Sequence, residues 1–249
     1  MSSKIDLYRS ALRECPDWPG YLCANSHLPG PRGNLELAEA VFQEASREMI
    51  LSLIARDSTE VEENSPQVFG VFCGVFGLGR LLAGGELDWM PKLREYASDR
   101  RWRVREAVAW ALQKYGAADM PGLLAQMRPW AAGTFLEQRA VAVALCEPSL
   151  LNDPAAVREV LQILDGITVS LSRAVERKTD DFRALRQTLG YGWSVAAVAS
   201  WADGKAFLER WFECADPDVR WLMRENLKKK RLERADSDWV QKWRIDLDR

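Results

Sequence analysis

The sequence has little of what marks secreted, metal-binding or histidine-dependent proteins. Its five cysteines are scattered and odd in number, which favours free thiols in a reducing cytoplasm over a disulfide framework. His27 is the single histidine, so a mechanism that uses histidine has no second candidate base. With Cys15 and Cys23 it has neither the spacing nor the four ligands of a structural zinc site. We expect a cytoplasmic protein without a bound metal.

A membrane span and the common nucleotide-binding motifs are missing as well. The least charged stretch, Val68–Gly85, is broken by Arg80 and by repeated glycines, which is typical of a buried helix with close crossings. Neither a Walker A sequence nor a Rossmann fingerprint occurs, since these glycines follow no strand. The polar start, Met1–Asp6, lacks the pattern of a secretory signal. We predict no membrane association and no small-molecule cofactor.

The net charge is small but unevenly distributed. The 34 basic and 36 acidic residues give −2 at pH 7, so no global field draws the chain onto nucleic acid or an anionic membrane. Residues 1–90 carry 7 Lys and Arg against 13 Asp and Glu, whereas residues 91–249 carry 27 against 23. The mildly basic second part leaves nucleic acid as an alternative to a protein partner.

Strand signals are nearly absent, and apolar residues recur at helical spacing along almost the whole chain. From Leu35 to Leu53 they predict one long helix that ends near Asp57, and Pro66–Leu82 predicts the next. Two glycines in Gly190–Gly192 predict the end of a later helix. The remaining predicted helices span 87–97, 101–115, 120–131, 135–146, 180–189, 193–201, 205–214, 217–231 and 238–247, with a longer one opening at Asp153-Pro154.

Two distant segments, Arg101–Leu112 and Pro217–Leu227, look like copies of one helical unit. Each has Val-Arg near its start, an apolar residue four positions after the Val and a Leu eight positions after it. The matched positions, which we predict to be buried, are Val104, Val108 and Leu112 in one copy and Val219, Met223 and Leu227 in the other. Unit starts at Val104, Gln138, Phe182 and Val219 lie 34, 44 and 37 residues apart, a range typical of stacked helix pairs.

This pattern predicts an all-α fold, an α-α superhelix of about five to six helix pairs. A single pair is too small to bury its apolar face alone, so neighbouring pairs have to stack. We expect one solenoid domain over residues 34–249, preceded by a cap or lead-in over residues 1–33.

The repeated segments resemble HEAT repeats of the ARM/HEAT superfamily. The second helix of such a repeat has Asp, then Val-Arg, then Ala or Leu. A similar pattern occurs at Asp216–Leu222 and, with one extra residue, at Asp99–Ala107. The stretch Phe182–Leu232 looks like bacterial HEAT-like proteins of undefined role. The resemblance covers roughly residues 66–232 and implies a HEAT-like solenoid that holds a macromolecular partner on its concave face.

An enzymatic branch of that superfamily, the HEAT-like alkyl-purine DNA glycosylases, is also similar. Its members have a Trp and Asp pair one repeat before an Arg, and Arg139 in Arg139-Ala140-Val141-Ala142 has the place of that Arg. Asp99 and Trp102 lie near the place of the pair, but in the reverse order. This resemblance implies DNA binding or repair as the alternative function and, if the chain is an enzyme, a glycosylase-like hydrolase that needs a carboxylate.

No complete catalytic constellation is visible in the sequence, so the leading hypothesis is a non-enzymatic binding or scaffold protein with a protein partner. Arg recurs at the second position of each unit, as Arg105, Arg139, Arg183 and Arg220. Such a ladder could grip phosphates or an acidic peptide, or it could bond carboxylates of neighbouring repeats such as Asp99 or Asp218.

The segment Gly190–Trp193 predicts a sharp turn at a helix junction. Its aromatic residues, Tyr191 and Trp193, are either exposed for stacking on a partner or buried as a connector with glycines that permit close packing. The predicted functional surface consists of Arg139, Arg183, Arg186, Trp193, Arg220 and Arg224, with no catalytic residue among them.

Overall fold

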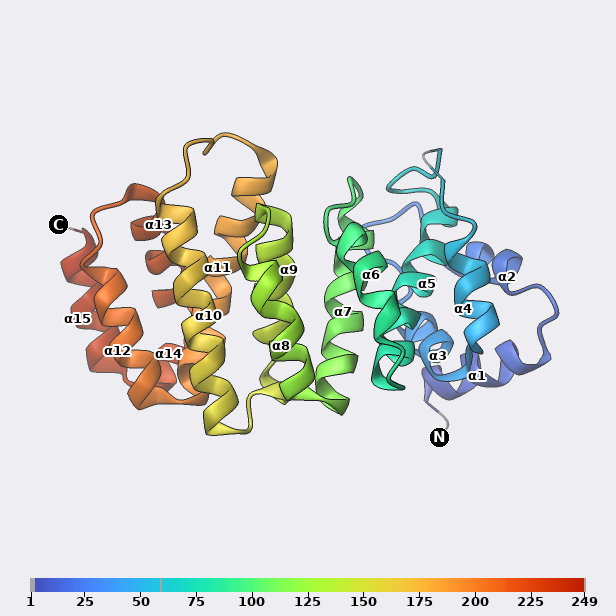
Figure 1. Cartoon of the computed structure of the whole chain (residues 1–249), viewed down its shortest axis with the longest axis horizontal. Coiled ribbons are helices and arrows are strands. Elements are labelled where there is room, and N and C mark those ends of the chain that lie inside the picture. Colours follow the sequence, from blue (N-terminus) through green and yellow to red (C-terminus); the bar gives the residue numbers. More distant parts are fainter. Residues whose placement is uncertain (1–2, 59, 249) are drawn as a thin grey trace. The chain divides into compact units, whose positions relative to one another are not determined.

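Figure 1 draws the computed structural model of the chain, which describes residues 3–58 and 60–248. Every regular element in these residues is helical, which confirms the predicted all-α class. The chain divides into two compact parts, Met1–Tyr115 and Gly116–Arg249, called unit 1 and unit 2 below. Each unit has its own buried core, and the two are described separately.

Unit 1 surrounds one apolar helix, α5. Its elements are α1 (Lys4–Glu14), α2 (Trp18–Ala24), α3 (Leu35–Glu44), α4 (Arg47–Ile54), α5 (Pro66–Ala83), the 3₁₀ turn η1 (Leu87–Trp89), α6 (Met90–Ala97) and α7 (Trp102–Ala118), whose last residues belong to unit 2. Helices α2, α3, α4 and α6 all contact α5. Helix α5 is long and apolar enough to cross a membrane, but most of its side chains are buried within unit 1.

The glycines of α5 allow neighbouring helices to approach closely. A Cβ on Gly79 would lie 2.5 Å from the carbonyl oxygen of Ala111 in α7, and one on Gly77 would lie 2.8 Å from Cγ1 of Ile50 in α4. These contacts confirm the prediction of a buried helix with close crossings. At Gly79 the obstacle is backbone, which cannot turn aside, so a larger residue does not fit without movement of a helix.

Unit 2 is built from consecutive helix pairs. Its elements are α8 (Met120–Ala131), α9 (Phe135–Leu145), the 3₁₀ turn η2 (Pro148–Leu150), α10 (Pro154–Ser172), α11 (Asp180–Ala199), α12 (Trp201–Phe212), α13 (Pro217–Leu227), α14 (Lys230–Ala235) and α15 (Ser237–Asp248). Helices α8 and α9, α10 and α11, and α12 and α13 contact each other as pairs. Helix α11 lies between α9 and α13, and α10 contacts both α8 and α12.

The six apolar positions of the repeated unit are all buried, as predicted. Val104, Val108 and Leu112 in α7 and Val219 and Met223 in α13 are 0% exposed, and Leu227 is 1% exposed. A period of four residues places these side chains on one face of each helix, so one pattern produces the same buried stripe in both units.

The prediction of one long helix from Leu35 to Asp57 is wrong. The chain leaves the helix at Ala45, whose backbone is extended, and α4 begins after Ser46. The Ser46 hydroxyl accepts a hydrogen bond from the backbone N–H of Met49 and caps the new helix. The apolar spacing continues across this break, which is why the sequence pattern did not reveal it.

Two predicted helix ends in unit 2 are also wrong. Helix α11 continues through Gly190–Gly192 without a turn, and it joins the two predicted helices 180–189 and 193–201. Conversely, the predicted helix 217–231 ends at Leu227, and α14 begins after Lys228 and Lys229. Contacts with other helices, rather than the local propensity of glycine or lysine, decide both outcomes.

Candidate functional site

The six residues of the predicted functional surface have different environments. Arg139 is half-buried on α9, and Arg183 is exposed on α11, where its Nη1 lies 2.5 Å from Oδ1 of Asp180 one turn earlier. Asp180 is itself almost fully exposed, so this ion pair contributes little to stability. As binding residues, Arg139 and Arg183 stay predictions.

Arg186 connects α11 to α13. Its Nη1 forms an ion pair with Asp218 near the start of α13, and its Cζ lies 4.4 Å from the centroid of the Trp221 ring. A guanidinium that is bonded at one edge and stacked on an indole is held in one orientation. The position of Arg186 therefore depends on the packing of α13 against α11.

Arg220 and Arg224 hold the end of the last helix. The Nη2 atoms of both residues donate to the same backbone carbonyl, that of Leu247 in α15, and the distance from Arg220 is 2.7 Å. Cationic side chains at the carboxyl end of a helix also interact favourably with the negative end of the helix dipole. Arg186, Arg220 and Arg224 thus join three helices of unit 2, namely α11, α13 and α15.

The prediction that Trp193 offers an exposed ring is wrong. Trp193 is 0% exposed, and its Nε1 donates to the Thr168 hydroxyl of α10 over 3.0 Å. The aromatic residue that reaches solvent is Tyr191, which is 48% exposed. Because the segment is helical, Tyr191 and Trp193 point in directions about 200° apart, so only one of them can face solvent.

The two glycines around Tyr191 serve the helices on either side of α11. A Cβ on Gly192 would lie 3.0 Å from Sγ of Cys146, at the end of α9, and one on Gly190 would lie 3.2 Å from Cβ of Glu225 in α13. This confirms that the glycines permit close packing, one toward each neighbour, while Tyr191 projects between them into solvent.

Asn226 of α13 bonds to the backbone of α11 at this point. Its Oδ1 accepts from the N–H of Ser194, and its Nδ2 donates to the carbonyls of Leu189 and Leu222, each over 2.8 Å. Asn226 is 0% exposed, so these three bonds satisfy a buried amide. They also support α11 on both sides of its glycines, which explains why the helix does not end there.

Tyr191 is flanked by two cations from the segment after α13. Cζ of Arg231 lies 4.4 Å and Nζ of Lys229 lies 5.6 Å from the centroid of its ring. Nη2 of Arg231 also donates to the Tyr191 hydroxyl over 2.5 Å. Within the basic run at residues 228–231, Lys229 and Arg231 therefore contact the ring of Tyr191, while Lys228 lies just after the end of α13.

A hollow of about 350 Å³ lies beside this cluster, and we call it the α13 groove. Its lining residues are Trp221, Arg224, Glu225, Leu227, Lys228 and Arg244. Three of them are cationic and one is acidic, with Trp221 and Leu227 as the apolar part. Arg224 was predicted from the sequence, whereas Trp221 and Arg244 were not. Their only signal was amphipathic spacing, which does not show that residues from α13 and α15 meet.

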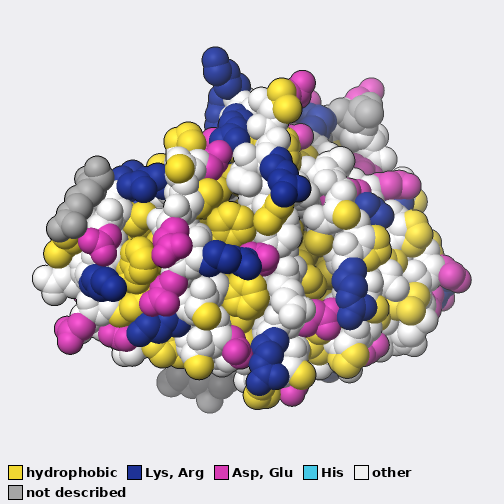
Figure 2. All heavy atoms as spheres, turned by 60° about the vertical axis from the view of Figure 1, so that its left-hand side comes forward, with side chains coloured by type: hydrophobic (Ala, Val, Ile, Leu, Met, Phe, Trp, Pro, Cys, Tyr) yellow, Lys and Arg dark blue, Asp and Glu magenta, His cyan; other side chains and the backbone are white. Residues whose placement is uncertain are grey.

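The surface as a whole does not carry charge of one sign. On the face drawn in Figure 2, Lys and Arg side chains alternate with Asp and Glu, and hydrophobic side chains lie between them. On this face, mixed charges of both signs weaken the attraction of a polyanion over a long distance.

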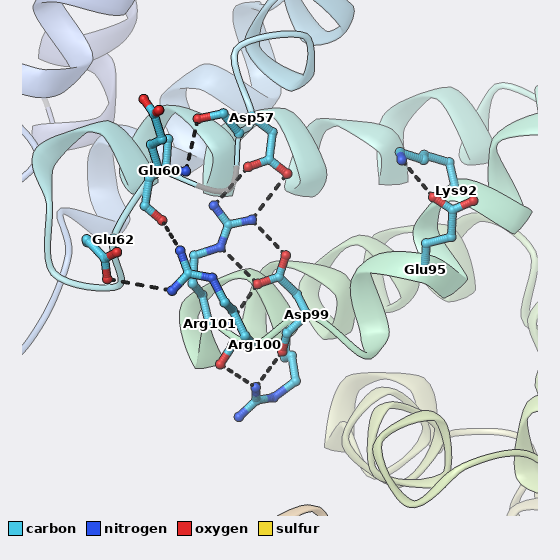
Figure 3. A network of polar contacts seen from close by, with 11 residues as sticks. Asp57, Glu60, Glu62, Lys92, Glu95, Asp99, Arg100 and Arg101 are labelled. Atoms are coloured by element: carbon cyan, nitrogen blue, oxygen red, sulfur yellow. Dashed lines mark hydrogen bonds and ion pairs between the residues drawn. The ribbon is translucent and has the colours of Figure 1, made fainter.

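Asp99, the carboxylate nearest to the glycosylase pattern, is held in a structural network. Figure 3 shows Arg101 pointing between Asp57 and Asp99, and its guanidinium lies 2.8 Å from Oδ1 of Asp57 and 2.7 Å from Oδ2 of Asp99. Burial favours the neutral form of Asp99, but hydrogen bonds from Arg101 outweigh it and hold the pKa of Asp99 below its ordinary value. Both carboxylate oxygens of Asp99 accept hydrogen bonds from Arg101, and these bonds hold the segment between α6 and α7.

Metal sites and relatives add no further assignment. Among the described residues, no group of His, Cys, Asp and Glu has the arrangement of a metal site. Scans against family models, curated proteins and solved structures found no match to this chain.

Proposed function

We propose that the chain is a non-enzymatic binding protein in which helix pairs stack as a HEAT-like solenoid, and that the α13 groove holds an acidic segment of a partner protein. The observation that carries the proposal is the composition of the groove. It joins an indole ring to three cationic side chains at one hollow of about 350 Å³.

The packing of unit 2 supports the solenoid. Three successive helix pairs have equivalent contacts, because α9, α11 and α13 are neighbours in turn, and so are α8, α10 and α12. The unit starts Gln138, Phe182 and Val219 are 2%, 0% and 0% exposed, as a common register requires. Repetition of one pair in one register is what distinguishes a solenoid from an irregular bundle.

The charges of the groove favour an acidic partner. Arg224 is held by Leu247, and Nη2 of Arg244 donates to the carbonyl of Leu227 over 2.7 Å, so both guanidinium groups are fixed before a partner arrives. Ordering a long side chain in advance removes part of the entropy cost of binding. Among the lining residues, Arg224, Lys228 and Arg244 stand against the single carboxylate of Glu225, which forms an ion pair with Lys228 at 2.5 Å, so positive charges outnumber negative ones in the groove wall.

The test uses a fluorescent peptide, acetyl-Glu-Glu-Phe-Glu-Glu-amide with a carboxyl-terminal dye, and measures its anisotropy. We expect saturable binding that Lys228→Glu weakens roughly fivefold, because one favourable rim charge becomes unfavourable. Lys242→Glu is the matched control, since this exposed lysine of α15 does not line the groove. Equal weakening by both variants would show a general charge effect and would contradict the proposal.

A single-stranded oligonucleotide with the same dye tests the DNA-binding alternative. A protein that grips phosphates loses affinity steeply as salt rises, whereas an aromatic anchor in a groove keeps part of its affinity. Tighter binding of the oligonucleotide, with a steep salt slope that Lys228→Glu reduces, would replace the proposal by the alternative. Absence of binding to both probes at low salt would exclude both functions for the α13 groove.

A further inference from the structure

Unit 1 contains a smaller hollow of about 200 Å³ with mainly aromatic walls, which we call the aromatic pocket. Six residues define its character: Leu35, Phe69, Phe72, Arg103, Glu106 and Trp110. The exposed Trp102 stands at its edge and also borders a second, more open hollow that is lined by Pro29, Asn64 and Arg103. No pattern in the sequence predicted this pocket.

Two helices supply the aromatic walls. Trp102, Glu106 and Trp110 are spaced by four residues and therefore share one face of α7, while Phe69 and Phe72 come from one face of α5. The rings of Phe72 and Trp110 meet edge to face, at 77° and a centroid distance of 5.6 Å. Two aromatic walls at nearly right angles form a corner in which a third ring can stack on one wall and meet the other by its edge.

The polar part of the wall has an unusual buried cation. Arg103 is 6% exposed; its Nη2 donates to the carbonyl of Gly30 over 2.7 Å, and its Nη1 lies 3.3 Å from Glu63. Its Nε has no hydrogen-bond partner among the residues that the structure describes. A buried N–H without an acceptor is unfavourable, so an acceptor oxygen beside Arg103 would be stabilising.

The charges around the pocket balance. Arg103 is paired with Glu63, and the remaining charged residues of the lining are Arg32, exposed at the mouth, and Glu106 in the wall. A carboxylate has about four lone-pair positions, so Glu106 can accept a further hydrogen bond alongside any it already makes. A site with one donor group, one acceptor group and no net charge is complementary to a neutral polar group that both accepts and donates.

The volume limits what can enter. Pockets for drug-sized ligands measure about 300–1,000 Å³, so a hollow of about 200 Å³ accommodates a single ring with one small substituent. From these features we infer that the aromatic pocket binds an aromatic ring bearing a neutral carboxamide. The ring lies in the corner that the Phe and Trp walls form, the amide oxygen accepts from Arg103, and the amide N–H donates to Glu106.

Four small compounds test this inference on the full chain by two-dimensional amide NMR titration. Benzamide carries the inferred group, benzoate and benzylamine replace it with a negative and a positive group, and toluene has neither charge nor hydrogen bonds. We expect benzamide to shift the signals of residues around the pocket and to bind about tenfold more tightly than the other three, the ratio expected from one hydrogen bond to a charged group. Tightest binding of benzylamine or toluene would overturn the inference, as would no shift at millimolar benzamide.

Two variants and one control make the result specific. Glu106→Gln leaves the shape of the wall but removes its negative charge, so the preference for benzamide over benzoate should fall about tenfold or reverse. Leu35→Trp fills the hollow and should abolish the shifts. Glu36→Gln removes a neighbouring carboxylate that does not line the pocket and should change neither result. An unchanged preference in Glu106→Gln contradicts the assigned geometry.

The same chemistry occurs in a free aromatic amide and in an aromatic residue of a peptide, whose ring lies near main-chain amides. N-acetyl-phenylalaninamide separates these sources. The open hollow beside Trp102 has room for a continuing chain, so tighter binding of this compound than of benzamide would assign the pocket to a peptide side chain. Weaker binding would assign it to a free small molecule.

Discussion

The two similar segments begin with the same kind of ionic link but with the charges exchanged. At the start of α7, Arg101 is bound by Asp57 from the loop between α4 and α5. In α13 the corresponding position, three residues before Val219, is Asp216, and Arg177 from the loop between α10 and α11 binds it over 2.7 Å. Arg177 also binds Asp218 over 3.0 Å. The link is common to both units, while its polarity and its burial are not.

The helix crossings behind these links differ as well. Gly79 of α5 meets the backbone of Ala111 directly, whereas the positions 115 residues later are Ser194 and Asn226, which are joined by a hydrogen bond of 2.8 Å. In unit 1 the two helices therefore come close because Gly79 has no side chain, and in unit 2 they are joined by the buried amide of Asn226. The comparison teaches that the buried apolar stripe defines the unit and that the polar contacts around it are interchangeable.

The largest effect should come from removing the buried arginine. Arg101→Met leaves Asp57 and Asp99 without their cation, which costs about 3–5 kcal/mol for a buried pair. Arg177→Met should cost less, about 1–3 kcal/mol, because the Arg177 side chain is 29% exposed and water can replace it. Chemical denaturation measures both. Equal losses would show that polarity and burial do not matter, contrary to the comparison.

The buried stripe can be tested by matched truncations. Leu112→Ala and Leu227→Ala should each lower the free energy of unfolding by about 2–5 kcal/mol, since both positions are at most 1% exposed. The exposed Leu7 of α1, truncated in the same way, serves as the control and should cost well under 1 kcal/mol. A negligible loss at only one of the two buried positions would show that the two segments are not equivalent units.

Alanine at the crossing glycines should separate the two kinds of contact. Gly79→Ala forces α5 and α7 apart and should destabilise unit 1 by about 1–3 kcal/mol. Gly190→Ala places its Cβ 3.2 Å from Cβ of Glu225, which a shift of a few tenths of an ångström between α11 and α13 relieves, and it gains about 1 kcal/mol of helix propensity. Its melting temperature should therefore change little. A large loss at Gly190 would mean that α11 and α13 are packed as rigidly as α5 and α7.

The last effect concerns acid, and water screens it because the side chain of Arg13, which forms an ion pair with Glu44, is 58% exposed. Hydrogen bonds from Arg13 and Arg9 in α1 hold the pKa of Glu44, in α3, at about 2 instead of 4.5. Because the folded-state pKa is the lower one, the contribution of Glu44 is complete above about pH 4.5 and is lost as the pH falls toward 2. Glu44→Gln should flatten the stability curve of unit 1 in that window alone. A difference that persists unchanged below pH 2 would point to a cause other than this ionisation.

The sequence was sufficient for the helical class and for the buried stripe, because a period of four residues constrains which face is apolar. It was not sufficient for the arginines. Arg105 and Arg220 follow the equivalent valines, Val104 and Val219. Arg105 donates to the carbonyl of Asp99 just before its own helix, whereas Arg220 donates to the carbonyl of Leu247 in another helix. The partner depends on which segment lies nearby, and no local pattern contains that information.

The error at Gly190–Gly192 has the same origin. Two glycines in three residues are unfavourable within an isolated helix, and the prediction of a stop followed from that local preference. Additional hydrogen bonds on both sides of these glycines come from Asn226, which is 32 residues away from Ser194. The aromatic pocket was missed because it requires α5 and α7 to be adjacent, and that adjacency is a property of the fold.

Asn226 also links the local unfolding of α11 to that of α13. The amide hydrogen of Ser194 is bonded to a side chain of α13, so its exchange with solvent deuterium requires α13 to move away, not only α11 to fray. The two helices should therefore exchange as one cooperative unit, with the Ser194 amide as its reporter. A single buried amide thereby couples the local unfolding of α11 to that of α13.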